Sequence, residues 1–150
     1  MLGILNSKYE LVELAGEGGM AHVYRGYTLG AEGCRRPVAV KRILEGFADN
    51  AEFLEMFVEE ARVSATIHHP NVVQIHDFDR DDAGHFYLVM EWVPGVNLLD
   101  WCEGHRLRGQ RTPWHLVAAV GIEVSKGLGA AHENHNEQGG LSPIYHRDVT

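Results

Sequence analysis

Cysteine is scarce in this sequence, and long apolar runs are missing from it. The two cysteines, Cys34 and Cys102, lie far apart in a chain of 150 residues, which predicts isolated reduced thiols rather than a disulfide framework or a zinc site. The ten histidines show no paired His/Cys spacing of the kind that binds a metal. No stretch approaches the ~20 apolar residues of a membrane span, and the apolar start at residues 1–5 is too short for a signal peptide. We therefore expect no membrane segment in the chain and a cytoplasmic location.

Positive charge is also in short supply. The chain has 13 Lys and Arg against 21 Asp and Glu, which gives a net charge of −8 at pH 7. Nucleic-acid binding needs clustered cations that neutralise phosphates, so we expect no nucleic-acid partner. The hydrophobic fraction of 45% and the charged fraction of 23% are ordinary for a globular protein. The length suggests one domain or part of one.

Apolar and polar residues alternate along the first part of the chain in the pattern that predicts β-strands. The predicted strands cover five ranges: 9–15, 21–27, 37–44, 72–78 and 86–93. One helix is expected between the third and fourth strands, because Asp49 or Asn50 can cap a helix that runs to about Ile67.

The pattern changes after Pro94-Gly95, where helical spacing replaces alternation. A short helix is expected from Leu98, and Thr112-Pro113 predicts the start of a longer one with Thr112 as its N-cap. The longer helix carries an apolar stripe made by Val117, Val120, Val124, Leu128 and Ala131. This order predicts an α+β fold with a strand-rich lobe at 1–93, a connection at 94–97 and the start of a helical lobe at 98–150.

Residues 16–23 form a glycine-rich segment, Gly-Glu-Gly-Gly-Met-Ala-His-Val, between the first two predicted strands. Backbone N–H groups in such a turn can surround phosphate oxygens, because glycine has no Cβ to block a close approach. The segment lacks the Gly-Lys-Ser/Thr of a Walker loop, and a strand follows it where a Rossmann fingerprint requires a helix. By itself it indicates only a hairpin turn, since glycine-rich turns are common and mostly structural.

Lys41 ends the alternating segment Val38-Ala39-Val40-Lys41. If its side chain faces inward, its ammonium needs an anion, because a buried unpaired charge is costly. The following helix offers Glu60, which shares a helical face with Met56, Phe57 and Val63. Two alternatives stay open from these residues: Glu60 pairs with Lys41, or it lies at the edge of the apolar face and reaches water. Its neighbour Glu59 points away, toward Arg62.

The tripeptide His146-Arg147-Asp148 follows the apolar pair Ile144-Tyr145 near the end of the chain. An aspartate in such a loop can accept a proton from a hydroxyl substrate or orient that hydroxyl. As an isolated tripeptide it identifies no function.

Taken in order and spacing, these three segments resemble the set of signature motifs of the protein kinase family. Their residues are most similar to those of bacterial serine/threonine kinases of the eukaryotic-like type. Two further segments support the resemblance: His69-Pro70-Asn71-Val72-Val73 after the helix, and Leu88 to Val93, which is similar to the hinge strand. The resemblance extends from about Tyr9 to Thr150. It implies the protein-kinase-like fold, with a five-stranded antiparallel N-lobe and one main helix, followed by the first helices of an α-rich C-lobe.

The resemblance also implies roles for individual residues. Lys41 would contact the α- and β-phosphates of ATP, Glu60 would hold Lys41, and Asp148 would be the catalytic base. Met90 would be the gatekeeper, the residue beside the adenine site, while the backbone of Glu91 and Val93 would bind adenine. The full set implied for the nucleotide is Ala15, Gly16, Glu17, Gly18, Gly19, Met20, Ala21, Val23, Ala39, Lys41, Met90, Glu91, Val93 and Asn97.

The sequence departs from the family pattern at several places. Ala21 stands where a third loop glycine is usual, and Thr150 stands where a lysine often follows the catalytic aspartate by two residues. The segment 134–143 is longer than the family's usual link before the catalytic loop. The resemblance locates the magnesium ligands and the activation loop beyond Thr150, so we expect no metal ligand within the chain and poor turnover by the chain alone.

The function that the resemblance implies is transfer of a phosphoryl group from ATP, with Mg²⁺, to a serine or threonine hydroxyl of a protein substrate. A second hypothesis is a nucleotide-binding pseudokinase or an interaction module without catalysis. A small-molecule phosphotransferase of related fold is the weakest of the three, because Gly-Glu-Gly-Gly-Met and Glu-Glu-Ala-Arg favour a protein kinase.

Overall fold

The computed structural model describes residues 2–136 and 138–146. The chain divides into two compact units. Met1–Thr66 and Val73–Trp92 form the first, which we term the sheet unit, and Ile67–Val72 and Val93–Thr150 form the second, the helical unit. Among the described residues, no helix is both long and apolar enough to cross a membrane.

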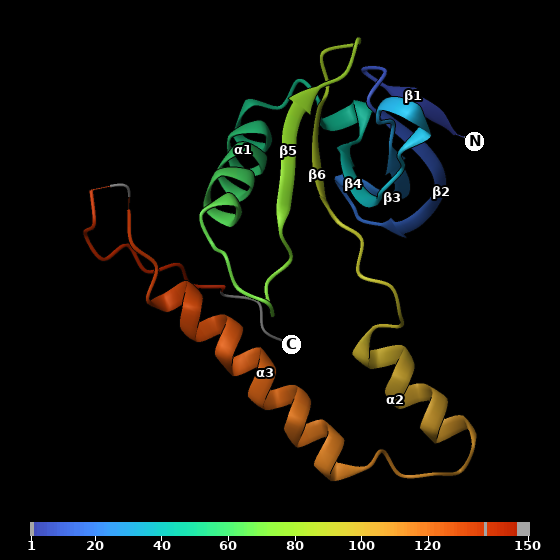
Figure 1. Cartoon of the computed structure of the whole chain (residues 1–150), viewed down its shortest axis with the longest axis vertical. Helices are drawn as coiled ribbons and strands as arrows, with labels where there is room; N and C mark the ends of the chain where they lie inside the picture. Colours follow the sequence, from blue (N-terminus) through green and yellow to red (C-terminus); the bar gives the residue numbers. More distant parts are fainter. Residues whose placement is uncertain (1, 137, 147–150) are drawn as a thin grey trace. The chain divides into compact units, whose positions relative to one another are not determined.

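An antiparallel sheet of six strands makes up most of the sheet unit (Figure 1). The strands are β1 (Gly3–Leu5), β2 (Tyr9–Glu17), β3 (Ala21–Thr28), β4 (Pro37–Ile43), β5 (Ile75–Arg80) and β6 (Phe86–Glu91), in the spatial order β1-β2-β3-β4-β6-β5. The predicted number of five strands is wrong by one, because β1 has three residues and is too short to show alternation. The predicted strand at 72–78 is also displaced, since Val72 lies in a turn in which its N–H donates to the His69 carbonyl at 3.0 Å.

Helix α1 (Ala51–Ala65) packs on this sheet and lies beside β5 (Figure 1). Of the two predicted caps, Asn50 is the one used: its side chain accepts a hydrogen bond from the Phe53 N–H at 3.1 Å. The helix buries Phe57 and Ala61 against Ala21, Ile43 and Leu88. We term this side of the sheet the α1 face.

The opposite side of the sheet has its own core, formed by Leu5, Tyr9, Leu11, Val38, Val40, Tyr87 and Val89. Alternation along β4 explains the division, because Val38 and Val40 point to this side while Ala39 and Lys41 point to the α1 face. The side chain of residue 41 is therefore directed toward α1 by the period of the strand that carries it.

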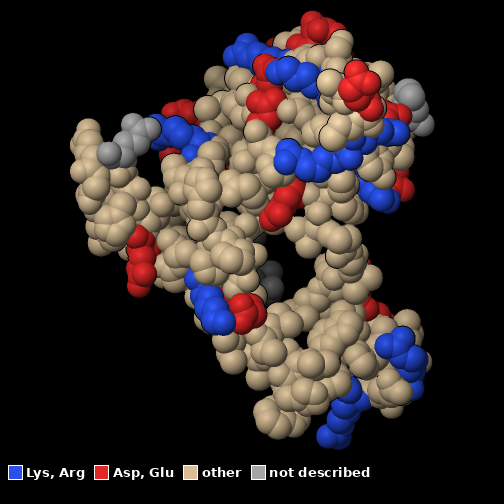
Figure 2. Space-filling view, viewed as in Figure 1, with Lys and Arg blue, Asp and Glu red and all other residues tan. Residues whose placement is uncertain are grey.

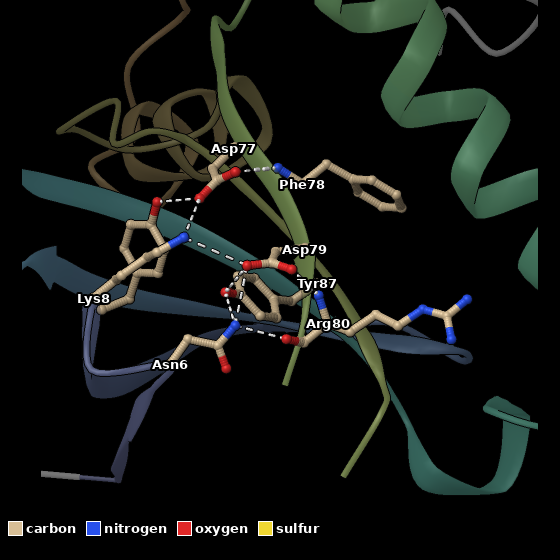
Figure 3. Close-up of polar contacts among 8 residues, drawn as sticks. Asn6, Lys8, Asp77, Phe78, Asp79, Arg80 and Tyr87 are labelled. Atoms are coloured by element: carbon tan, nitrogen blue, oxygen red, sulfur yellow. Dashed lines mark hydrogen bonds and ion pairs between the residues drawn. The ribbon is translucent and has the colours of Figure 1, made fainter. Parts of the chain in front are cut away.

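A polar cluster joins the turn between β1 and β2, at one edge of the sheet, to β5 at the other edge (Figure 3). The Tyr9 hydroxyl donates to Asp77 Oδ2 at 2.6 Å, and Asn6 Nδ2 donates to Asp79 Oδ2 at 3.1 Å and to the Arg80 carbonyl at 2.7 Å. Contact between strands at opposite edges means that the sheet is strongly curled. We term Asn6, Lys8, Tyr9, Asp77, Asp79 and Tyr87 the clasp; the sequence gives no signal for it, because its members lie about 70 positions apart.

The helical unit contains α2 (Leu98–Leu107) and α3 (Trp114–His132). The predicted cap at Thr112 is wrong: Pro113 occupies the cap position, and no side chain there hydrogen-bonds the helix. The turn after α1 packs on α3, where Asn71 Nδ2 donates to the Glu123 carbonyl at 2.8 Å. Gly127 permits this approach, because a Cβ there would lie 3.0 Å from the Asn71 carbonyl oxygen.

Candidate functional site

The glycine-rich segment covers the end of β2, the tight turn at residues 18–20 and the start of β3. The Gly18 N–H donates to the Ala21 carbonyl at 3.0 Å, and a Cβ on Gly18 would stand 2.8 Å from that oxygen. Glycine is therefore required at position 18 by the turn itself. At Gly19, by contrast, no described atom outside Gly18, Gly19 and Met20 lies within 4 Å of where a Cβ would stand, so packing does not explain the missing side chain.

Lys41 and Glu60 form a bidentate ion pair between β4 and α1. Lys41 Nζ lies 2.6 Å from Glu60 Oε1 and 2.8 Å from Oε2. Of the two alternatives for Glu60, the structure has the one in which it turns to the lysine, whereas Glu59 pairs with Arg62 on the helix surface at 2.8 Å. The side chains of Lys41 and Glu60 are 27% and 49% exposed, so the pair stays accessible from solvent.

Phe57 also contacts the lysine, and sequence reasoning missed this role. Lys41 Nζ lies 5.6 Å from the centroid of the Phe57 ring, a cation–π distance. The signal was present in the sequence, because Phe57 precedes Glu60 by three residues and therefore lies beside it on α1. The lysine ammonium is thus held from one side by a carboxylate and from another by an aromatic ring.

The residues expected to surround the nucleotide share the α1 face. The strand register pairs Val23 with Lys41, Ala21 with Ile43, and Ala39 with Met90. Paired residues of antiparallel strands point to the same side of a sheet, so Val23, Ala39, Lys41 and Met90 form one surface. Ala21 and Ala39 are each only 7% exposed, so a larger side chain at either position would have little room.

A concave pocket of about 850 Å³ opens between the glycine-rich turn and α1. Gly18, Gly19, Met20, Ala21 and Lys41 line one side, and residues of α1, including Phe57 and Glu60, line the other. Lys41 is the only cation among its described lining residues. Val23, Ala39 and Met90 lie outside this lining, so the pocket covers the end expected to hold phosphates and leaves out the end expected to hold adenine.

The remaining predicted residues lie at the margins of this surface or outside the described part. Ala15 lies in the irregular stretch of β2 between Leu14 and Gly16, and Glu17 ends that strand. The Glu91 N–H donates to the Gln74 carbonyl at 2.9 Å, which ties the end of β6 to the start of β5. Asp148, the predicted catalytic base, and Arg147 lie outside the described residues.

Val93 and Asn97 belong to the helical unit. Val93 is 62% exposed. Asn97 caps α2: its Oδ1 accepts from the Asp100 N–H at 2.7 Å, and its Nδ2 donates to Asp100 Oδ2 at 2.8 Å. The cap uses one N–H and one oxygen lone pair of the Asn97 side chain, which leaves one donor and one lone pair for a further contact.

Comparison with known proteins identifies the family. The family model described as the protein kinase domain matches residues 9–150 of the sequence. The chain belongs to the protein kinase family. This kinase chain is 39% identical over 145 residues to tyrosine-protein kinase MasK of Myxococcus xanthus, and 37% identical over 153 residues to the probable serine/threonine-protein kinase CPE1738 of Clostridium perfringens.

Those alignments cover 95% and 99% of this kinase chain but only 22% and 20% of the two relatives, so it spans about a fifth of their length. Among solved structures it is similar to the kinase domain of Mycobacterium tuberculosis PknI, with 25% identity and a TM-score of 0.63. That similarity covers 87% of this chain and 50% of the solved one. The predicted protein-kinase-like fold and the resemblance to bacterial serine/threonine kinases are confirmed.

Proposed function

We propose that this chain is the nucleotide-binding part of a protein kinase that transfers the γ-phosphoryl group of ATP to serine or threonine hydroxyls of proteins. In this proposal residues 1–93 form the ATP-binding lobe, 94–97 the hinge and 98–150 the start of the second lobe. The observation that carries it is the ion pair of Lys41 with Glu60, which lies in the same pocket as the glycine-rich turn.

The part of the pocket formed by Lys41 and the glycine-rich turn suits a phosphate chain, whereas Glu52, Glu55 and Glu59 line it on the α1 side. Lys41 supplies a positive charge whose position is fixed by two bonds to Glu60, and a fixed charge needs no rearrangement when a phosphate arrives. Gly19 leaves open space beside the backbone, which allows phosphate oxygens to approach it closely. Val23, Ala39 and Met90 provide an adjoining apolar surface of the kind that packs on adenine.

Mg²⁺ would neutralise charge on the phosphates, and its ligands are not expected within this chain. When bound, ATP and the metal supply the phosphoryl group and its electrostatic activation. The residues of this chain bind and orient: Lys41 holds phosphate oxygens, Glu60 and Phe57 hold Lys41, and Asp148 would orient the acceptor hydroxyl.

The most specific part of the proposal is the type of residue that accepts the phosphoryl group. Relatives from Clostridium perfringens and Bacillus subtilis are named serine/threonine kinases, while the 39% identical relative from Myxococcus xanthus is named a tyrosine kinase. We favour serine and threonine because most of these relatives carry that name. The identity of the phosphorylated residue tests this part separately from the transfer itself.

The experiment is phosphorylation of a generic protein by the full-length gene product, with radiolabelled ATP, in the wild type and in Lys41→Met. We expect the substitution to lower the rate by about a hundredfold or more, because it removes the fixed charge that would hold the α- and β-phosphates in place for transfer. Lys126→Met is the matched control, since Lys126 forms a similar 2.6 Å ion pair with Glu123 on the surface of α3.

Undiminished transfer by Lys41→Met, or an equal loss in Lys126→Met, would overturn the assigned role of the lysine. A wild-type protein that binds ATP but transfers nothing would favour the pseudokinase. Phosphoamino-acid analysis of the product should give phosphoserine or phosphothreonine, and phosphotyrosine would refute the proposed acceptor class.

A further inference from the structure

Arginine and aromatic side chains alternate along one row of the sheet unit. The guanidinium carbon of Arg25 lies 5.3 Å from the centroid of the Trp92 ring and 6.0 Å from that of Tyr27. Arg35 lies on Tyr27 in turn, at 4.5 Å. Arginine in this position attracts the π-faces of its neighbours through its charge and stacks on them through its planar shape.

The row reaches the α1 face at Arg25. Strand register pairs Arg25 with Ala39, and Ala39 with Met90, so Arg25 points to the same side as the residues expected around adenine. Its guanidinium is itself anchored, because Nη1 donates to Glu13 Oε1 at 3.0 Å and Nη2 donates to the Tyr27 hydroxyl at 3.4 Å.

Trp92 follows directly after the end of β6. The last pair between β4 and β6 is Val38 with Glu91, so the ladder with β4 stops one residue before the tryptophan. The Arg25 side chain reaches past this last pair and holds the ring of the next residue. The contact from Arg25 on β3 therefore holds a residue that strand pairing with β4 no longer holds. That residue lies in the segment that the kinase resemblance assigns to adenine.

We propose that Arg25 is a positioning residue for nucleotide binding: by stacking on Trp92 it fixes the first residue after β6, and with it the course of the backbone beyond Glu91 that the kinase resemblance assigns to adenine. This inference rests on the proposed kinase function. It assigns a role to a residue that has no place in the kinase signature segments. Arg25 acts through Trp92 and does not itself touch the reacting groups.

The energy of one such contact sets the size of the effect. An exposed or half-exposed cation–π contact corresponds to roughly a two- to fivefold change in an equilibrium constant. We therefore expect Arg25→Ala to raise the KM and the Kd for ATP by about threefold to fivefold, with kcat and the KM for the protein substrate unchanged. Arg25→Lys should rescue only in part, because it restores a charge without a plane that stacks.

The experiment measures KM, kcat and ATP affinity for the full-length protein and its variants. Arg35→Ala is the matched control, because it removes a cation from Tyr27 in the same row without touching Trp92. Trp92→Ala should reproduce the effect of Arg25→Ala, Trp92→Phe should restore part of the affinity, and the double variant should be no worse than either alanine variant alone.

The inference is overturned if Arg25→Ala binds ATP as tightly as the wild type. It is also overturned if Arg35→Ala weakens binding equally, or if the effects of Arg25→Ala and Trp92→Ala add in full. Failure of the proposed function has a different signature, because the wild type itself would then transfer no phosphoryl group from ATP, whether or not it binds the nucleotide.

Discussion

Two clusters of charged side chains lie in the sheet unit, and they differ in how their charges are satisfied. On the α1 face, Lys41 and Glu60 rely on each other, and both remain partly exposed. In the clasp, Asp79 accepts from the Asn6 amide and from the Arg80 N–H, and the ammonium of Lys8 lies 3.5 Å away. The bonds of the clasp join β5 to the turn after β1, whereas the Lys41–Glu60 pair joins β4 to α1 beside the pocket. We infer that the clasp serves the fold and that the pair is placed to take up a ligand.

The tyrosines of the clasp make this contrast sharper. Burial, and next the nearby charge of Asp79, raise the pKa of Tyr87 to about 12. Burial and the hydrogen bond to Asp77 raise the pKa of Tyr9 further above its ordinary value. Both hydroxyls therefore remain protonated donors at any physiological pH, as a structural cluster requires.

The surface charges fit the same division. On the face that Figure 2 shows, acidic and basic side chains of the sheet unit lie intermixed, and exposed ion pairs such as Arg25 with Glu13 occur in this unit. An exposed pair of this kind stabilises a fold by about 1 kcal/mol at most. Lys41 and Glu60 thus contribute little to folding, and their value lies in the position that they give to one ammonium group.

The largest expected effect comes from neutralising Glu60. Glu60→Gln should lower kcat/KM for ATP by about a hundredfold, because a lysine displaced by about 1 Å no longer meets the phosphates. Glu59→Gln is the matched control, since Glu59 is its neighbour on α1 and also lines the pocket, but pairs with Arg62 instead of Lys41. Steady-state kinetics measure kcat/KM for both variants, and equal losses would mean that Glu60 has no role beyond that of Glu59.

Alanine substitutions in the glycine-rich turn separate folding from binding. Gly18→Ala should lower the free energy of unfolding by about 1–2 kcal/mol, because its Cβ would meet the Ala21 carbonyl oxygen at 2.8 Å. Gly19→Ala should leave stability nearly unchanged and weaken ATP binding, since only a ligand would meet its Cβ. Urea unfolding and calorimetric titration measure the two quantities, and the reverse pattern would contradict this reading of the turn.

Removing one hydroxyl from the clasp should affect stability alone. Tyr9→Phe deletes the 2.6 Å hydrogen bond to Asp77 and should lower the free energy of unfolding by about 1 kcal/mol, with kcat and KM unchanged. Tyr24→Phe is the comparison, because its hydroxyl has only a 3.4 Å contact with His22. A change in kcat on Tyr9→Phe would mean that the clasp and the site are coupled.

The smallest expected effect is a loss of stability at low pH. Hydrogen bonds from the Arg80 N–H and Asn6, together with Lys8, lower the pKa of Asp79 in the folded protein. A carboxyl with a lowered pKa stabilises the fold above the pKa of its unfolded state, and this contribution is lost as pH falls through the folded value. Urea midpoints should therefore drop on acidification below about pH 4. Asp79→Asn should flatten that drop, and an unchanged profile would contradict the assignment.

Local pattern was enough to predict much of this molecule. Alternation gave β2, β3, β4 and β6 to within a few residues, and Asn50 gave the start of α1. The motif order predicted the kinase family, and a lysine on the α1 face next to a glutamate in an apolar stripe suggested their contact. These features depend on neighbours in sequence or on a period of two or 3.6 residues.

Other features depend on contacts that have no local signature. The clasp and the Arg25–Trp92 stack join residues about 70 positions apart, and no spacing rule links them. Strand β1 offers three residues, fewer than alternation needs. Thr112 is a residue type that often caps helices. The helix nevertheless begins one residue later than a cap at Thr112 requires, and Pro113 occupies the cap position.

Labelling with an acyl phosphate of ATP tests the central claim most directly. Such a probe transfers its acyl group to an amine that lies beside the bound phosphates, and mass spectrometry then identifies the modified lysine. We predict that Lys41 of the full-length protein is acylated and that excess ATP prevents the reaction, while Lys8 and Lys126 react weakly and without protection. Equal labelling of all three lysines, or labelling of Lys41 that ATP does not suppress, would contradict a phosphate site at the Lys41–Glu60 pair.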